Sequence, residues 1–224
     1  RVHLTPNPFK KGLPFRQELR LGHGEILIRA GDAESQIETR VWVDANRPVV
    51  HVEVNGPKPF EVEANVQIWR QEARELTGEE AHGVEGLSKN TPPLVYPDVV
   101  ANGATNHIVW YHRNEDSLWP ETLRHQGLQA LIGKLRDPLL NRTFGAAMGG
   151  VGLIKASSKI LKSREPLRNF RISIQALTAQ TPTSDAWIKQ LDDRIAAVRA
   201  VDLEKARIEH RRWWEEFWQR SWLH

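Results

Sequence analysis

Alternating apolar and polar side chains fill most of the first third of the sequence, and this pattern limits the folds that the chain can adopt. Successive side chains of a β-strand point to opposite faces of a sheet, so a period of two indicates strands with one face buried. Several such strands at close spacing, joined by turns, predict an antiparallel β-sandwich. The five segments are residues 15–21, 25–30, 38–44, 49–54 and 60–69.

Glycine, proline and asparagine mark the expected connections. Residues 22–24, Gly-His-Gly, are expected to form a tight hairpin, and residues 55–57, Asn-Gly-Pro, are expected to turn the chain between two strands. The glycine-rich segment 142–161 is a poor helix former, so a hairpin through Gly149 and Gly150 is predicted there.

Further strands follow between irregular stretches. Residues 106–115 and 170–176 alternate again, whereas residues 70–106 and 116–136 show little periodicity. Loops of this length within a compact domain are often functional. We expect both stretches to be excursions from the sandwich.

After Thr181 the hydrophobic period changes from 2 to 3.6 residues, which indicates helices. Residues 181–185 offer N-cap side chains for a first helix, and Asp202 can cap a second. The predicted fold class is therefore mainly β: an antiparallel β-sandwich over residues 1–180, followed by two C-terminal helices over residues 181–224. The apolar positions at helical spacing are Trp187, Leu191, Ile195 and Val198.

Composition and motifs exclude several classes of function. Lys+Arg 31 against Asp+Glu 28 gives a net charge of +3 without long runs of one sign, so nucleic acid is not indicated as a partner. No segment approaches eighteen consecutive apolar residues, so no membrane span is predicted. His51 and Glu53 share a strand face, but two ligands do not make a metal site. The sequence has no cysteine and none of the motifs typical of nucleotide binding, dinucleotide binding or zinc proteases. We therefore expect no cofactor, no metal and no catalytic residue in this chain.

The densest group of polar and aromatic side chains is the end of the strand at residues 110–115. Aromatic rings stack on sugars, and these polar side chains can hydrogen-bond sugar hydroxyls, so the group is a candidate wall of a substrate cleft. The alternative is that Trp110 belongs to the core and the polar residues cap a strand. The candidates are Trp110, Tyr111, His112, Arg113, Asn114 and Glu115.

Four tryptophans lie within the last twelve residues, and at helical spacing most of these aromatic residues share one face. Such a face needs a partner, because each ring can bury roughly 150–250 Å². Three interpretations stay open: a linker helix packed against a missing domain, a helix lying in a membrane interface, and an ordinary packed C-terminal helix. The expected packing residues are His210, Trp213, Trp214, Phe217, Trp218 and Trp222.

Four stretches, residues 6–26, 40–54, 108–115 and 210–224, resemble the N-terminal domain of unknown function found in certain bacterial glycoside-hydrolase-like proteins. Such proteins are similar to inverting α-L-fucosidase-type and sugar-phosphorylase-type enzymes. The resemblance implies a β-supersandwich, a helical linker and a missing C-terminal (α/α)6 barrel that holds the catalytic acids. It also implies an extracellular or periplasmic location, with the signal peptide outside this sequence.

The resulting hypothesis is a non-catalytic N-terminal domain that packs on a downstream catalytic domain of the same polypeptide, shapes its cleft and possibly contacts carbohydrate. One alternative is an independent carbohydrate-binding module, for which Trp42 and Trp69 are available on the polar sides of their strands. The other is a structural interaction domain that docks through its Trp-rich helix.

Overall fold

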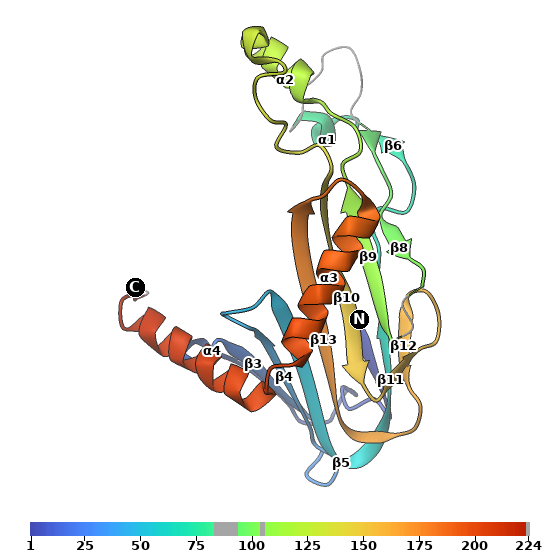
Figure 1. Ribbon diagram of the computed structural model, residues 1–224. Helices are drawn as coiled ribbons and strands as arrows, with labels where there is room; N and C mark the ends of the chain where they lie inside the picture. Colours follow the sequence, from blue (N-terminus) through green and yellow to red (C-terminus); the bar gives the residue numbers. More distant parts are fainter. Residues whose placement is uncertain (83–93, 104–105, 223–224) are drawn as a thin grey trace.

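A single long strand, β5 (Val49–Asn65), connects the two sheets of the sandwich in the computed structural model, which describes residues 1–82, 94–103 and 106–222 (Figure 1). Its first half pairs with β4 and β13 in the large sheet. Its second half pairs with β1 on one side and β12 on the other, in the small sheet. A strand that passes from one sheet to the other in this way forms a corner of the sandwich.

The large sheet is antiparallel throughout and has the strand order β2-β3-β4-β5-β13-β10-β9-β8. The small sheet adds β11 beside β12. The remaining strand bounds are β1 (Val2–Thr5), β2 (Phe15–Arg20), β3 (Glu25–Ala30), β4 (Ile37–Val43), β8 (Val99–Ala101), β9 (His107–Arg113), β10 (Arg142–Val151), β11 (Leu153–Lys155), β12 (Ile160–Ser163) and β13 (Leu167–Gln180). The mainly β fold with two C-terminal helices is thus confirmed.

The main core lies between the two sheets. Phe60 of β5 meets Phe170 of β13 with ring centroids 5.9 Å apart, and Leu161 of β12 is fully buried. From β9 and β10 the same core receives Ile108 and Met148. These residues occupy alternate positions of their strands, as the period of two predicts.

Two helices cover the opposite face of the large sheet (Figure 1). α3 (Ser184–Arg199) begins at Thr183, whose hydroxyl accepts a hydrogen bond from the backbone N–H of Ala186, and α4 (Leu203–Trp218) begins at Asp202 in the same manner. Both predicted N-caps are confirmed. The buried stripe of α3, Trp187, Leu191 and Ile195, packs on β9, β10 and β13 as a second core.

Two turn predictions are wrong. Residues 55–57 continue β5. Gly56 packs against Phe60 and Ile37 within this strand, and an added Cβ would come within 3.2 Å of their side chains. Gly149 and Gly150 lie inside β10, and the chain turns after them at Gly152, which has a φ of +79°. The hairpin at residues 22–24 is confirmed: η1 (Leu21–His23) and the left-handed Gly24 join β2 to β3.

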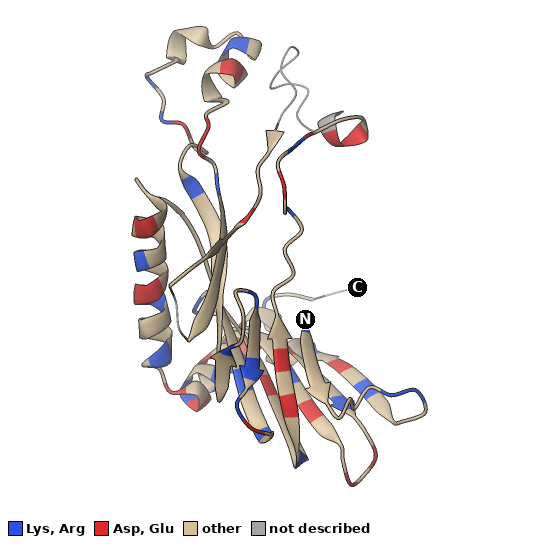
Figure 2. Ribbon diagram, turned by 90° about the vertical axis from the view of Figure 1, so that its right-hand side faces the viewer, with Lys and Arg blue, Asp and Glu red and all other residues tan. Residues whose placement is uncertain are grey.

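The irregular stretches extend beyond one end of the sheets (Figure 1). They carry β6 (Arg74–Glu75), α1 (Glu79–His82), β7 (Leu94–Val95), α2 (Trp119–His125) and η2 (Gln129–Leu131). Residues 83–93 and 104–105 of the predicted excursion lie outside the described residues. Basic and acidic residues are interspersed along α3 (Figure 2). Among the helices described, none combines the length and apolarity that a membrane crossing needs.

Candidate functional site

The candidate residues of β9 do not form a single surface, because alternate residues point to opposite faces of the sheet. Trp110 packs against the core between the sheets. Tyr111 points the other way and lies on Trp187 of α3, with ring centroids 5.4 Å apart. Both aromatic rings therefore contribute to packing. For Trp110 this agrees with the alternative interpretation, in which its ring belongs to the core.

Arg113 is committed to hydrogen bonds within the chain. Its side chain is 7% exposed. Its Nη2 donates to the carbonyl oxygens of Thr181 (2.9 Å) and Pro182 (3.0 Å), just before α3. Its Nη1 donates to Thr143 Oγ1 at 2.8 Å, and both terminal nitrogens contact Asn141. The guanidinium thus joins the end of β9 to the start of α3.

His112 belongs to a polar cluster on the other face. Its Nδ1 lies 3.2 Å from Asp98 Oδ1, which also accepts a hydrogen bond from Arg70 Nε at 2.7 Å. Burial lowers the pKa of His112, Arg70 lowers it further, and Asp98 opposes this shift. Asn114 donates to the Leu139 carbonyl at 3.3 Å.

Glu115 is the most accessible of the six candidates. Its side chain is 77% exposed, and its carboxylate lies 4.0 Å from Arg113 Nε. Its carboxylate is therefore open to solvent.

The aromatic residues of α4 divide into two groups. His210, Trp214 and Trp218 face the β-domain. His210 is 1% exposed: its Nδ1 accepts from the Ala45 N–H and its Nε2 lies 3.2 Å from the Gly24 carbonyl, an arrangement that fits a neutral ring protonated at Nε2. Trp214 covers Gly24, and the indole of Trp218 donates to the Leu21 carbonyl at 2.8 Å.

The second group, Trp213 and Phe217, lies toward the outside. The prediction that Trp222 belongs to the same helix is wrong, because α4 ends at Trp218. Trp213 is 41% exposed and Trp222 is 79% exposed. The rings of Trp213 and Phe217 are stacked, with centroids 5.5 Å apart and planes at 7°. Asn46, Glu209, Arg212 and Glu216 line a shallow hollow beside Trp213. The β-domain leaves this side of the helix uncovered.

Buried carboxylates fasten the inner side of α4 to the sheet. Glu25 of β3 is 2% exposed and lies within 4 Å of Arg20, Arg40 and Arg211, which come from β2, β4 and α4. Glu53 of β5 accepts hydrogen bonds from Arg207 of α4 and from the indole of Trp42. Sequence patterns did not indicate these carboxylates as packing residues: Glu25 has the alternation of a wet-face position, and Glu53 is indicated only as a candidate metal ligand beside His51.

Trp42 is buried, contrary to the expectation that it lies on a wet face. It is 1% exposed, and its ring stacks on His51 with centroids 4.3 Å apart. The helix α4 covers this part of the sheet, and His210 also contacts the Trp42 ring. Trp69, in contrast, is 93% exposed.

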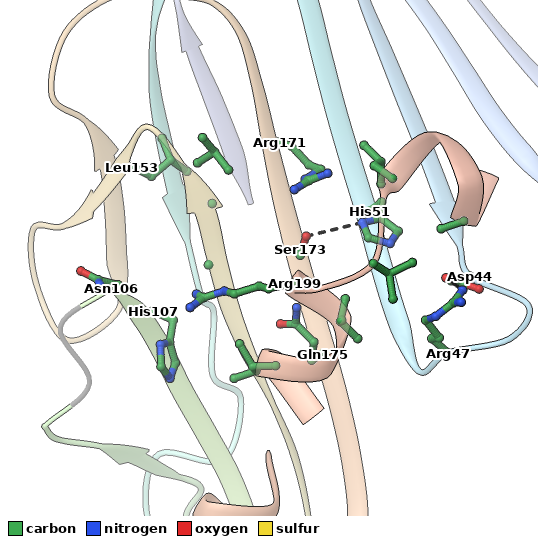
Figure 3. Close-up of a pocket in the computed structure, with 18 residues that line it drawn as sticks. Asp44, Arg47, His51, Asn106, His107, Leu153, Arg171, Ser173, Gln175 and Arg199 are labelled. Atoms are coloured by element: carbon green, nitrogen blue, oxygen red, sulfur yellow. Dashed lines mark hydrogen bonds and ion pairs between the residues drawn. The ribbon is translucent and has the colours of Figure 1, made fainter. Parts of the chain in front are cut away.

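A cavity of about 440 Å³ lies between the large sheet and the connection from α3 to α4 (Figure 3). Four residues paired across neighbouring strands line its floor: His107, Gly149, Ser173 and His51, on β9, β10, β13 and β5. Gly149 and Ser173 are small, so the sheet leaves room between the two histidines. The helices contribute the apolar side chains of Ile195, Val198, Leu203 and Ala206.

The cavity has a basic lining. Arg47, Arg171 and Arg199 reach it, and Asp44 is the sole acid among its described lining residues. Burial lowers the pKa of His51 to about 4, and the charge of Arg171 contributes to this shift. Burial also lowers the pKa of His107, against the effect of Asp192. Both rings are therefore neutral near pH 7.

Sequence reasoning missed this cavity, because its floor comes from four strands whose register depends on distant pairings. The available signal was the pair of small residues, Gly149 and Gly150, within an apolar segment. Within the described part of the chain, no group of three or more His, Asp or Glu side chains is arranged to hold a metal ion.

Comparisons with known proteins place the chain in a family. A solved structure named "Putative kojibiose phosphorylase from human microbiome" matches with a TM-score of 0.48 and 8% identity over 93% of this chain. The chain spans 26% of the length of that protein. No curated protein sequence matches. The family model for the N-terminal part of DUF5703, described as "Domain of unknown function (DUF5703)", matches residues 1–223. The chain therefore belongs to the DUF5703 N-terminal domain family.

Proposed function

We propose that this chain is the non-catalytic N-terminal β-domain of a larger carbohydrate-active protein, and that it packs on the following catalytic domain through the outer side of α4. The observation that carries the proposal is the uncovered aromatic side of this helix, where Trp213 is 41% exposed, together with Trp222 beyond the helix end, which is 79% exposed. The membership in an N-terminal domain family supports a following domain. The sequence resemblance supports a carbohydrate-active one.

The composition of this surface suits a protein interface. Interface centres are rich in aromatic residues, and their rims are polar. Trp213 and Phe217 supply a stacked aromatic centre, and Glu209, Arg212 and Glu216 surround it. The inner side of α4 is fixed by His210 and its hydrogen bonds to the β-domain. A helix held in this way presents its outer side in a defined orientation, which lowers the entropic cost of docking.

Shaping of a substrate cleft is the finer part of the proposal, and Glu115 is its best-placed residue. The terminal nitrogens of Arg113 are already donors to the chain itself, so we assign that residue to the scaffold. An independent carbohydrate-binding module is less well supported. Of the two tryptophans available for it, Trp42 is buried and only Trp69 is exposed.

The test compares Trp213→Ala in the isolated chain and in the longer protein that contains the following domain. Loss of a buried tryptophan costs about 3–5 kcal/mol, whereas surface substitutions usually change stability by less than about 0.5 kcal/mol. We expect a small change in the free energy of unfolding of the isolated chain and a large one in the longer protein, measured by urea denaturation.

The matched control is Trp69→Ala, which removes a more exposed tryptophan far from α4 in sequence. It should have a small effect in both proteins. Equal effects of Trp213→Ala in the two proteins would rule out docking through this side of the helix.

A further inference from the structure

We propose that the cavity between α3, α4 and the large sheet binds a small organic molecule through an oxyanion group, either a carboxylate or a phosphate. The charges of its lining are the first reason. Arg47 is neutralised by Asp44 and Glu209, each 3.0 Å away. Among the described residues, Arg171 and Arg199 have no ion-pair partner, although both line the cavity. Two guanidinium groups are thus left without a counter-ion.

The position of Arg199 is the second reason. Its Nη2 would lie 3.7 Å from a Cβ built on Gly149, so the guanidinium lies over the floor of the cavity. The absence of a side chain at Gly149 leaves the space that this arginine and a ligand need. Figure 3 shows Arg171 entering from β13 beside Ser173, and Arg199 entering from the helix beside Gln175. Planar guanidinium groups match the geometry of carboxylate and phosphate oxygens.

Gln175 provides a third, independent indication. It is 5% exposed, and its side chain makes no hydrogen bond to any described residue. The amide atoms of Gln175 are not themselves fully enclosed, so a ligand or water in the cavity can reach them. Gln175 lies on β13 two residues from Ser173, so both side chains point to the cavity face of the sheet.

The chemistry of the lining favours an anion over a cation. The two carboxylate oxygens of Asp44 already accept from the Asn46 N–H and from Arg47. The described donors that remain are the guanidiniums of Arg171 and Arg199 and the amide of Gln175, since the hydroxyl of Ser173 already lies 3.4 Å from His51 Nδ1. The apolar side chains of Val198 and Leu203 can cover the uncharged part of the molecule. The volume of about 440 Å³ falls within the range of small-molecule sites.

The experiment titrates inorganic phosphate and, separately, acetate into the 224-residue chain at constant ionic strength. Binding is followed by two-dimensional ¹H–¹⁵N NMR. We expect saturable shifts of the amide signals of Gly149, Ser173 and Gln175 with at least one of the two anions. Saturation with phosphate alone assigns the site to phosphate compounds, and saturation with acetate assigns it to carboxylates.

Substitutions make the result specific to the site. Arg199→Gln and Arg171→Gln should each weaken binding about tenfold or more, because each removes a charge-assisted contact. Arg199 is exposed, so its variant should fold even if Arg171→Gln does not. The control is Arg194→Gln, an exposed arginine of α3 that does not line the cavity. Shifts that rise linearly with both anions, or equal weakening by Arg194→Gln, would overturn the proposal.

Discussion

At the scale of the residue, the Arg113 side chain holds together three parts of the chain that are far apart in sequence. It contacts Asn141, Thr143 and the Thr181 carbonyl, and it does so from a nearly buried position. A buried carbonyl that loses its donor carries the full cost of its lost hydration. The clamp therefore stabilises the junction at which the β-sandwich passes into α3.

We predict that Arg113→Ala lowers the free energy of unfolding by about 2–4 kcal/mol, because several acceptors lose their donors together. Urea denaturation at pH 7.5 measures this effect. Arg136→Ala is the control, since Arg136 is exposed in the neighbouring loop, and it should change stability by less than about 0.5 kcal/mol. A change of that small size in Arg113→Ala would show that the observed hydrogen bonds do not stabilise the junction.

The sequence identified the stretch 110–115 as unusual but could not assign its roles. Alternation predicted that Trp110 and Tyr111 point to opposite faces, and they do. Nothing near Arg113 in sequence indicates its acceptors, because Asn141 and Thr181 follow it by 28 and 68 residues. Roles that depend on distant partners require the register of β9, β10 and β13, which local patterns do not contain.

At the scale of the element, α4 is positioned by its contact with the short turn η1. Trp214 covers Gly24, where an added Cβ would lie 1.9 Å from the indole Nε1. Gly24 also has a φ of +61°, which disfavours any side chain. The glycine therefore permits both the turn between β2 and β3 and the close approach of the helix.

We predict that Gly24→Ala displaces α4, because neither the turn nor Trp214 can adjust without losing the contacts of His210 and Trp218. Hydrogen exchange should show faster exchange of the α4 amides, while the amides of β10 and β13 keep their protection. The control is Gly22→Ala in the same turn, where an added Cβ has nothing within 4 Å. Unchanged exchange of α4 in Gly24→Ala would contradict this account.

Elements with a strong local signal were predicted, and those shaped by tertiary contacts were not. The strands before residue 50 and both C-terminal helices follow from period and caps. Asn-Gly-Pro at residues 55–57 has the composition of a turn, yet β5 passes through it as the strand moves from one sheet to the other. Gly149 and Gly150 likewise lie in a strand. At Gly150 an added Cβ would come within 2.8 Å of Leu153 and the Arg171 carbonyl, whereas Gly149 lies on the floor of the cavity.

At the scale of the whole molecule, neutral histidines lie in the layer where the helices meet the large sheet. His51, His107 and His210 are on this layer, and burial is the largest cause of the lowered pKa of each. The pKa of His51 is about 4. Besides burial, Arg171, His210 and Arg207 lower this pKa, and Asp44 raises it. The helical layer therefore depends on histidines that remain uncharged.

We predict that acidification from pH 7.5 to 5 lowers the free energy of unfolding. The unfolded chain takes up protons below its ordinary histidine pKa of about 6.5, whereas folded His51 stays neutral down to about pH 4. The contribution of the neutral His51 ring to the free energy of unfolding is therefore fully present above about pH 6.5, and it is lost as the pH drops toward about 4. His51 alone should account for about 2 kcal/mol of the loss at pH 5.

Urea denaturation of His51→Gln at both pH values measures this contribution. The substitution removes the titrating ring, so the difference in the free energy of unfolding between pH 7.5 and 5 should shrink by about 2 kcal/mol. This holds even if the substitution also changes the free energy of unfolding at pH 7.5. The carboxylates with a lowered pKa, such as Asp32 and Asp137, stay ionised in this window and do not add to the slope. His3→Gln, at an exposed position of β1, should leave the difference unchanged. An equal pH dependence in His51→Gln and the unmodified chain would mean that this buried ring does not link folding to protonation.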